Sequence, residues 1–457
     1  MESGKQKTIL IQLTHGMQAR NFLYTSIFKK MTEAGVQLIL VVPEYKIPYY
    51  RETIDMTNVT LVPIPKKNET RIIQRIKNIS FNLLYTPTVK WWRDQRWEGK
   101  PKTFKYYAEV LLWYFGALSS ARRFARFVFS RVVDTSSFDV LFDHTEIDLV
   151  VVPDVYSIPD VFLFYAAKRH RIPTVCMVRS WDNVTSKGTC LIKPEKLIVH
   201  NERVRDEAVK YIGTPKDHIQ VTGLPHFDYY VSYEPTLPRA EFLRKLGMPE
   251  NARFILFADA TGSFRPITSE LLEILDTEIK NGALPRDVYI LFRYAPHKKK
   301  GENIFSSDRI IFDQPGKHFK QDGLNDWEFS KEDMHYMADC LTYASVMLNY
   351  ASTMTIDSAA MDCPVINVSF DGHTERNSSH SLSRIYTVQH FRHVLATGGT
   401  PLVKSREELI GAINAYLDDR SLDRAGRARI VKDQCTIQDG HAGDRVASRI
   451  LAEVGLS

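Results

Sequence analysis

The sequence predicts an α/β protein built from two doubly wound domains, and three observations indicate this class. Short apolar segments alternate with helix-like segments from residue 8 to residue 223, and a second alternating series runs from residue 254 to residue 417. Most of the apolar segments lack the polar alternation of a half-exposed strand, which is typical of parallel strands covered on both faces. A chain of 457 residues is also too long to fold around one core.

The first series predicts a domain over residues 1–230. Its opening unit is a strand, a helix and a second parallel strand, with Gly35 ending the helix and Pro43 stopping the second strand. The predicted strands lie at 8–13, 36–42, 59–63, 149–152, 174–178, 196–199 and 219–223, with helices near 20–34, at 158–170 and in the stretch ending at 211.

The second series predicts another domain over residues 231–457. Its strands are expected at 254–258, 288–293, 309–312, 344–349 and 363–366, and its helices at 239–246, 268–280, 333–340 and 405–417. Open parallel sheets bind ligands at the carboxyl ends of their strands, so we expect the two domains to face a cleft.

A basic, aromatic segment over residues 66–131 interrupts the first domain. It holds 15 Lys and Arg against 4 Asp and Glu, a balance of +11, whereas the whole chain carries +6. It predicts two or three helices, and one of them fits a helix lying on an anionic membrane. That helix combines Phe124, Phe127 and Val128 with Arg122, Arg123, Arg126 and Arg131. Packing on its own domain is the alternative, and nucleic acid is disfavoured because no recognition motif accompanies the charge.

Composition bears on location and cofactors. The five cysteines have no metal-ligand spacing, and reduced thiols in a cytoplasm fit them best. No window of about 20 apolar residues predicts a spanning helix, and the amino terminus lacks the apolar region of a signal peptide. We expect a cytoplasmic protein without metal or cofactor, with peripheral binding to the inner face of the cell membrane as one role of the insert.

The turn after the strand at 344–349 is the most informative segment of the chain. Ser352, Thr353 and Thr355 crowd the start of a short helix, where free backbone N–H groups and the helix dipole favour a phosphate. Asp357 lies one turn further on, where a carboxylate reaches a ribose hydroxyl. Capping of the helix by the same hydroxyls is the competing interpretation.

Two more strand ends in the second half carry groups suited to phosphate. Thr261, Gly262 and Ser263 form a small hydroxylated turn after one strand, although the chain has neither a Walker loop nor a dinucleotide fingerprint. Arg293 and His297 follow another strand, where positive charge would neutralise a phosphate. A plain strand-to-helix loop and a solvated basic loop are the alternatives.

In the first half, the loop after the strand at 174–178 mixes aromatic, acidic, amide, hydroxyl and cationic groups. Asp182 is a candidate to accept the proton of an acceptor hydroxyl, with a local Asx turn as the alternative. His15, at the end of the first strand, fits a base, a phosphate ligand or a satisfied turn residue equally well. The Asp182 loop also holds Trp181, Asn183 and Lys187.

Several of these segments carry a resemblance to known families. Residues 221–228, V-T-G-L-P-H-F-D with Gly223 as the glycine, are similar to an element that ends the first domain of many GT-B nucleotide-sugar enzymes. The stretch 338–372 resembles bacterial CDP-glycerol glycerophosphotransferases, and residues 439–446 are similar to the D-G-x-A-x-x-R-V close of that family. Trp-Asp-Asn at 181–183 stands where that family has Trp-His-Gly, and it resembles related surface-polysaccharide glycosyltransferases. The likeness implies a GT-B fold and a nucleotide diphosphate donor.

Residues and likeness together predict a glycosyltransferase that moves a sugar from a nucleotide-sugar donor to a glycan or lipid-linked glycan acceptor. The second domain would hold the donor, with hydroxyls and helix-start amides stabilising the leaving diphosphate without a metal. Asp182, or else His15, would deprotonate the acceptor, since chemistry at a sugar carbon commonly uses a carboxylate base. The alternatives are a CDP-polyol phosphotransferase, a non-hydrolysing sugar-nucleotide epimerase and a catalytically inactive assembly protein.

Overall fold

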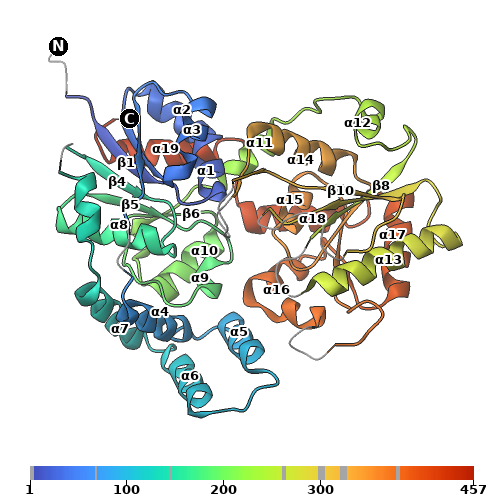
Figure 1. Cartoon of the computed structure of the whole chain (residues 1–457), viewed down its shortest axis with the longest axis horizontal. Helices are drawn as coiled ribbons and strands as arrows, with labels where there is room; N and C mark the ends of the chain where they lie inside the picture. The colour runs from blue at the N-terminus through green and yellow to red at the C-terminus, as the bar shows by residue number, and fades with distance from the viewer. Residues whose placement is uncertain are drawn as a thin grey trace. The chain divides into compact units, whose positions relative to one another are not determined.

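The chain folds into two compact units (Figure 1). Unit 1 comprises residues 1–229 and 434–457, and unit 2 comprises residues 230–433. The computed structural model describes residues 5–66, 69–143, 146–259, 264–296, 304–319, 327–376 and 381–456. The boundary expected at residue 230 lies beside this division, but the terminal segment 434–457, which the sequence assigned to the second half, packs with unit 1.

Unit 1 is built on a seven-stranded parallel sheet in the order β3-β2-β1-β4-β5-β6-β7. Its strands are β1 (Thr8–Gln12), β2 (Gln37–Val42), β3 (Val59–Pro63), β4 (Leu149–Val152), β5 (Thr174–Met177), β6 (Leu197–Val199) and β7 (Ile219–Val221). Helices α3 (Ile47–Thr53), α8 (Ile158–Arg169) and α10 (Glu202–Glu207) belong to the connections. The four central strands are fully buried, as their unbroken apolar runs predicted.

The first helical segment is interrupted. The sequence predicted one helix near residues 20–34, whereas the structure has α1 (Gly16–Leu23) and α2 (Ser26–Glu33). Thr25 lies between them with an extended backbone. Its hydroxyl donates to the Asn21 carbonyl at 2.8 Å and accepts from the Ile27 N–H at 3.4 Å. One threonine thus serves the end of one helix and the start of the next, which stabilises the break.

The insert forms four helices: α4 (Arg71–Asn82), α5 (Pro87–Trp97), α6 (Phe104–Phe115) and α7 (Ser119–Val132). Two of the four arginines that suggested a membrane-surface helix at α7 are not available to a membrane. Arg122 and Arg126 are buried and donate to backbone carbonyls of unit 1, those of Lys210 at 2.8 Å and Ile212 at 2.9 Å respectively. No helix among the described residues is both long and apolar enough to cross a membrane.

The carboxyl-terminal segment is fastened by two elements that the family likeness had singled out. Asp228 accepts the N–H groups of Ala442 and Gly443, at 2.9 and 2.7 Å, where α19 (Ala442–Ala452) begins. Arg445 in that helix donates to the Thr222 carbonyl at 2.8 Å. In Figure 1, α19 accordingly lies beside α2, although it comes last in the chain.

Gly223 is required at its position by close packing. Its φ is +87°, and a Cβ there would lie 3.0 Å from the Ile437 carbonyl oxygen and 3.1 Å from the Ala442 Cβ. These contacts explain why a glycine stands here without any ligand. Its predicted place on the acceptor side therefore depends only on its position in the chain.

Unit 2 is built on a six-stranded parallel sheet in the order β10-β9-β8-β13-β14-β15. Its strands are β8 (Arg253–Ala258), β9 (Val288–Arg293), β10 (Ile310–Asp313), β13 (Val346–Asn349), β14 (Val365–Val368) and β15 (Leu402–Val403). Its helices include α12 (Arg239–Lys245), α13 (Arg265–Asn281), α14 (Lys331–Tyr343), α15 (Met354–Ala360), α16 (Gln389–Leu395), α17 (Arg406–Asp418) and α18 (Arg424–Cys435), and a separate pair, β11 (Lys317–His318) and β12 (Trp327–Glu328), is antiparallel. Two apolar clusters, built around Leu271 and Leu341, form the core of the unit. Both units therefore have the doubly wound organisation that the sequence predicted.

Candidate functional site

Each sheet reverses its strand order beside its first strand, and ligands of open parallel sheets bind outside the carboxyl ends at such a point. The reversal lies between β1 and β4 in unit 1 and between β8 and β13 in unit 2. His15 follows β1, and the 350–353 turn follows β13. Two of the predicted site segments therefore stand at the switch points of the two sheets.

The turn after β13 is fixed from within by Asn349, the last residue of that strand. Its amide oxygen accepts from the Ser352 N–H at 3.3 Å and from the Thr355 hydroxyl at 3.1 Å. Thr353 stands at the N-cap of α15 without a side-chain capping bond, whereas the Ser352 hydroxyl accepts from the Met354 N–H at 3.3 Å. Capping thus accounts for Ser352 but not for Thr353.

Asn367 on β14 completes a buried polar network that the sequence analysis missed. It accepts from the Ala351 N–H at 3.2 Å and donates to the Thr400 hydroxyl at 2.8 Å. Ala351 has a φ of +44°, a left-handed conformation that costs a residue with a Cβ roughly 1–2 kcal/mol. Such strain persists only where neighbours hold it, and here it sets the direction of the N–H groups that open α15.

Two aspartates of the family-like stretch hold the segment that opens unit 2. Asp357, 5% exposed, accepts from the Tyr230 hydroxyl at 2.8 Å. Asp339 in α14 accepts from the N–H and hydroxyl of Thr236, at 3.2 and 2.5 Å, and from the Tyr233 hydroxyl. A ribose hydroxyl at Asp357 would have to share the carboxylate with Tyr230, so this contact stays a prediction.

Arg293 is engaged inside unit 2. It is 6% exposed, its guanidinium forms an ion pair with Asp313 on β10, and it lies over the Tyr336 ring at 5.3 Å. A cation already neutralised by an internal carboxylate attracts a phosphate less strongly. Its role as a phosphate ligand stays a prediction, and the ion pair with Asp313 gives Arg293 a structural role instead. The other predicted phosphate ligands of this edge, Thr261, Gly262, Ser263 and His297, lie outside the described residues.

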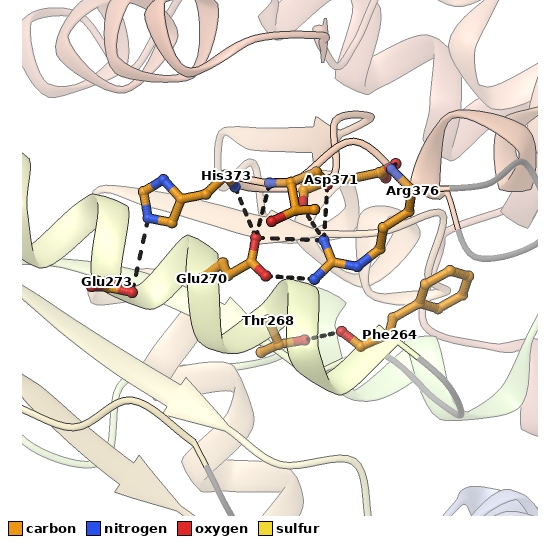
Figure 2. Close-up of polar contacts among 8 residues, drawn as sticks. Phe264, Thr268, Glu270, Glu273, Asp371, His373 and Arg376 are labelled. Carbon is orange, nitrogen blue, oxygen red and sulfur yellow. Dashed lines mark hydrogen bonds and ion pairs between the residues drawn. The ribbon is translucent and has the colours of Figure 1, made fainter.

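Figure 2 displays an ion-pair cluster that no local sequence pattern announced. Glu270 in α13 accepts from the Arg376 guanidinium and from the His373 N–H, the latter at 2.8 Å. Arg376 also donates to the Asp371 carbonyl. Burial raises the pKa of Glu270, but the Arg376 guanidinium and the backbone amides outweigh it and hold the pKa below its usual range. A Cβ on Gly372 would lie 2.5 Å from a Glu270 carboxylate oxygen, so glycine permits this approach. The loop after β14 is thus held against α13.

In unit 1, Asp182 follows β5 and opens the short helix α9 (Asn183–Ser186). Its carboxylate oxygens accept from the Ser180 hydroxyl at 2.6 Å and from the Ser186 hydroxyl at 2.9 Å. Two hydroxyl donors fix the direction of a carboxylate. It makes no capping bond to the backbone of α9, so the two hydroxyls, rather than a helix cap, orient it.

The rest of the Asp182 loop is closely packed. Trp181 and Asn183 are 6% and 1% exposed, whereas Lys187 is exposed. The loop rests on the insert: the Thr86 hydroxyl, at the start of α5, donates to the Thr185 carbonyl at 2.9 Å. The helices of the insert therefore support the loop that carries the candidate base.

His15 lies in a cationic environment. Burial, and then the charges of Arg179, Lys46 and Lys187, lower its pKa from 6.5 to about 3, so the imidazole is neutral near pH 7. Arg179 is itself paired with buried Asp154 at 2.8 Å. The structure thus brings two predicted site residues, His15 and Lys187, into one neighbourhood. Within the described part of the chain, no group of three or more His, Cys, Asp or Glu side chains is placed to bind a metal ion.

Sequence comparison identifies a family. Residues 178–452 match the family model described as CDP-Glycerol:Poly(glycerophosphate) glycerophosphotransferase. The matched region includes the Asp182 loop, the turn after β13 and the elements that fasten the terminal helix. None of the curated proteins matches the chain.

Solved structures share the fold at low sequence identity. Staphylococcus aureus MnaA, in a co-structure with UDP, has a TM-score of 0.57 at 11% identity, with 99% of this chain and 98% of that chain covered. UDP-GlcNAc 2-epimerase from Neisseria meningitidis, bound to UDP-GlcNAc, has a TM-score of 0.56 at 12% identity, covering 97% and 100%. A variant of the wall teichoic acid polymerase TagF has a TM-score of 0.53 at 13% identity, covering 98% and 89%. The predicted fold class, two Rossmann-like domains, is confirmed.

Proposed function

The chain belongs to the CDP-glycerol:poly(glycerophosphate) glycerophosphotransferase family, and from this premise we propose that it transfers a sugar from a nucleotide-diphosphate donor to a hydroxyl of a surface-glycan acceptor. It is a transferase of the glycosyl or glycerophosphate kind. In the proposal, unit 2 binds the donor and unit 1 binds the acceptor and supplies the base.

Asp182 is the observation that carries the choice of glycosyl transfer. It occupies the loop position at which the family resemblance expects a histidine, and its carboxylate is oriented by the Ser180 and Ser186 hydroxyls. A base must be held in position before it can accept the acceptor proton as the new bond to the sugar carbon forms. A carboxylate in this place favours chemistry at carbon over transfer of a phosphate.

The donor proposal rests on the turn after β13 and on the nucleotides held by proteins of the same fold. The MnaA and Neisseria structures contain UDP and UDP-GlcNAc. In this chain, the Ser352 and Thr353 hydroxyls would bind the diphosphate. The N–H groups of Ala351, Ser352 and Met354 already donate to side chains of unit 2, so they would fix the shape of the turn. Thr261, Gly262, Ser263, Arg293, His297 and Asp357 are the further proposed donor contacts.

Glycerophosphate transfer is the second candidate, and the family match favours it. The two candidates differ in the bond that breaks: C–O at the sugar carbon in one, P–O of the donor diphosphate in the other. They therefore differ in donor class, which one panel can separate.

The test is a thermal-shift panel with CDP, UDP, GDP and CMP, followed by turnover of the matching activated donors. We expect one nucleoside diphosphate to raise the melting temperature, because a ligand that binds only the native state stabilises it. Turnover of a nucleotide-sugar only when an acceptor is present supports the proposal. Turnover of CDP-glycerol, and of no nucleotide-sugar, selects the second candidate. Conversion of a nucleotide-sugar without acceptor indicates an epimerase. Binding without turnover of any donor contradicts both transferase proposals.

We also propose that the protein is cytoplasmic and binds an anionic membrane surface peripherally through its insert. Twelve of the seventeen exposed large hydrophobic side chains among the described residues lie on it, including Phe104 at 89% and Phe124 at 67% exposed. The insert also carries the balance of +11. Exposed aromatic and cationic groups together suit a bilayer with acidic headgroups.

Vesicle sedimentation tests this part separately. We expect binding to vesicles containing phosphatidylglycerol, weakened by salt and by the pair Phe104→Ser and Phe124→Ser. Leu422→Ser, an exposed leucine in unit 2, is the matched control. Equal sedimentation with neutral and anionic vesicles, or no effect of the two serines, would remove the membrane from the proposal.

A further inference from the structure

Two buried histidines of unit 1 have ring nitrogens without partners among the described residues. His200 follows β6, and His226 lies in the turn η5 (Pro225–Phe227) beyond β7; they are 2% and 7% exposed. The two strands are neighbours, and the Gly223 N–H donates to the His200 carbonyl at 3.1 Å, which joins the two loops. Among the described residues, neither nitrogen of His226 nor Nε2 of His200 has a hydrogen-bond partner.

Buried polar groups without a hydrogen-bond partner are uncommon in a folded protein. More than about nine in ten buried polar groups are paired, and leaving one unpaired costs about 1–3 kcal/mol. Here three nitrogens of two side chains share the same edge of one sheet. Unpaired buried groups that cost folding free energy are expected at sites where they bind a ligand.

Both rings are neutral near pH 7. Burial lowers the pKa of His200 to about 4, against the opposing effects of its bonds to the backbone of Arg179 and Gly223 and of the Asp182 charge. Burial, then the charges of Arg20 and His200, lower the pKa of His226 well below its ordinary value. A neutral imidazole has one N–H and one lone pair. Because backbone bonds to carbonyls use the N–H of His200, its Nε2 is an acceptor.

The chemistry of the three nitrogens defines the ligand. His226 offers one donor and one acceptor, and His200 offers one acceptor, so two lone pairs need a donor. A carboxylate ion offers none, whereas each hydroxyl both donates and accepts. We propose that His200 and His226 bind hydroxyl groups of a sugar or polyol at the edge of unit 1. Identifying that ligand with the acceptor rests on the proposed function; the site itself does not.

The experiment is nitrogen-15 NMR of the full chain labelled at histidine. Signals are assigned with His200→Asn and His226→Asn, and the wild-type protein is titrated with glycerol, N-acetylglucosamine and acetate. We expect a saturable shift of both ring signals with glycerol or N-acetylglucosamine and none with acetate. The exposed His218, assigned with His218→Asn, serves as the control signal and should not move.

Two results would overturn the site: acetate alone shifts the two signals, or no probe shifts them. Because the titration uses the unmodified protein, a variant that folds poorly affects only the assignment. Nucleotide thermal shifts recorded on the same sample keep the two proposals apart. Loss of the nucleotide shift counts against the proposed function, whereas unmoved imidazole signals with an intact nucleotide shift count against the histidine site alone.

Discussion

The carboxyl edges of the two sheets differ in how their ionisable side chains are held. In unit 2, Arg293, Asp357 and Glu270 are each bound to another side chain of the same unit. In unit 1, Asp182 and Arg179 are likewise held by neighbouring side chains, but His200 and His226 retain nitrogens that no described residue engages. Internal pairing positions a backbone, whereas an unpaired buried group has its full hydrogen-bonding capacity left for a ligand. We therefore expect unit 2 to act through the shape of its turns and unit 1 through side-chain chemistry.

The substitution Asp182→Asn tests this contrast with the largest expected effect. If unit 1 supplies the base, loss of the carboxylate should reduce transfer from the donor found in the panel by about 10²–10⁴-fold, with little change in the nucleotide thermal shift. The amide keeps the size of the side chain and can still accept from Ser180. Initial rates at saturating donor measure the effect.

The matched control for that substitution is Asp217→Asn, an aspartate of unit 1 with an 81% exposed side chain. It should leave transfer unchanged. A rate for Asp182→Asn within a few-fold of the wild type would remove Asp182 as the base and leave His15 as the remaining predicted candidate.

Asn367→Ala tests whether unit 2 depends on the shape of its turn. The change leaves the Ala351 N–H and the Thr400 hydroxyl without the partner they have now, both in a buried site. We expect a loss of about 2–4 kcal/mol in the free energy of unfolding, together with a weaker nucleotide shift. Denaturant unfolding measures the first effect and thermal shift the second.

Asn414→Ala is the control, because Asn414 makes one surface bond, to the Ala283 carbonyl at 2.9 Å. It should cost less than about 1 kcal/mol. If Asn367→Ala destabilises the protein but leaves the nucleotide shift intact, the turn is structural and the donor lies elsewhere.

The sequence was sufficient for most strands of the two sheets because parallel strands are local, unbroken apolar runs. The four strands β1, β4, β5 and β6 lie where those runs predicted them. The strand β15 was missed because only Leu402 and Val403 belong to it. The break at Thr25 was missed because the apolar pattern continues across it and only the hydroxyl marks the cap.

The site was predictable only where its residues are neighbours in the chain. Ser352, Thr353 and Asp357 were found together because one turn holds them. Glu270 and Arg376 are 106 residues apart, and their pairing depends on the sheet order, which a single sequence does not fix. The placement of residues 434–457 failed for a similar reason, since the Asp228 bonds that fasten α19 reach across more than 200 residues.

His15→Asn probes the charge environment of unit 1. The folded-state pKa of about 3 lies below the ordinary 6.5, so between these values the unfolded chain binds a proton that the folded chain does not. Stability therefore falls as pH falls through that window. Between pH 7 and pH 5 the variant should lose about 1–2 kcal/mol less than the wild type. Urea unfolding at the two pH values measures this, and an equal loss in both proteins would mean that His15 is already solvated.

The smallest expected effect concerns the Glu270–Arg376 pair (Figure 2). Its side chains are 22% and 19% exposed, so solvent screens part of the attraction while burial retains part of it. A double-mutant cycle with Glu270→Gln and Arg376→Gln should give a coupling energy of about 1 kcal/mol, diminished by salt. Each single variant also unfastens the loop after β14 from α13, so nucleotide affinity is measured alongside stability. Coupling in stability alone would mean that the pair only stabilises the fold. Coupling in both stability and nucleotide affinity would mean that a second loop of unit 2 acts on the ligand through its shape.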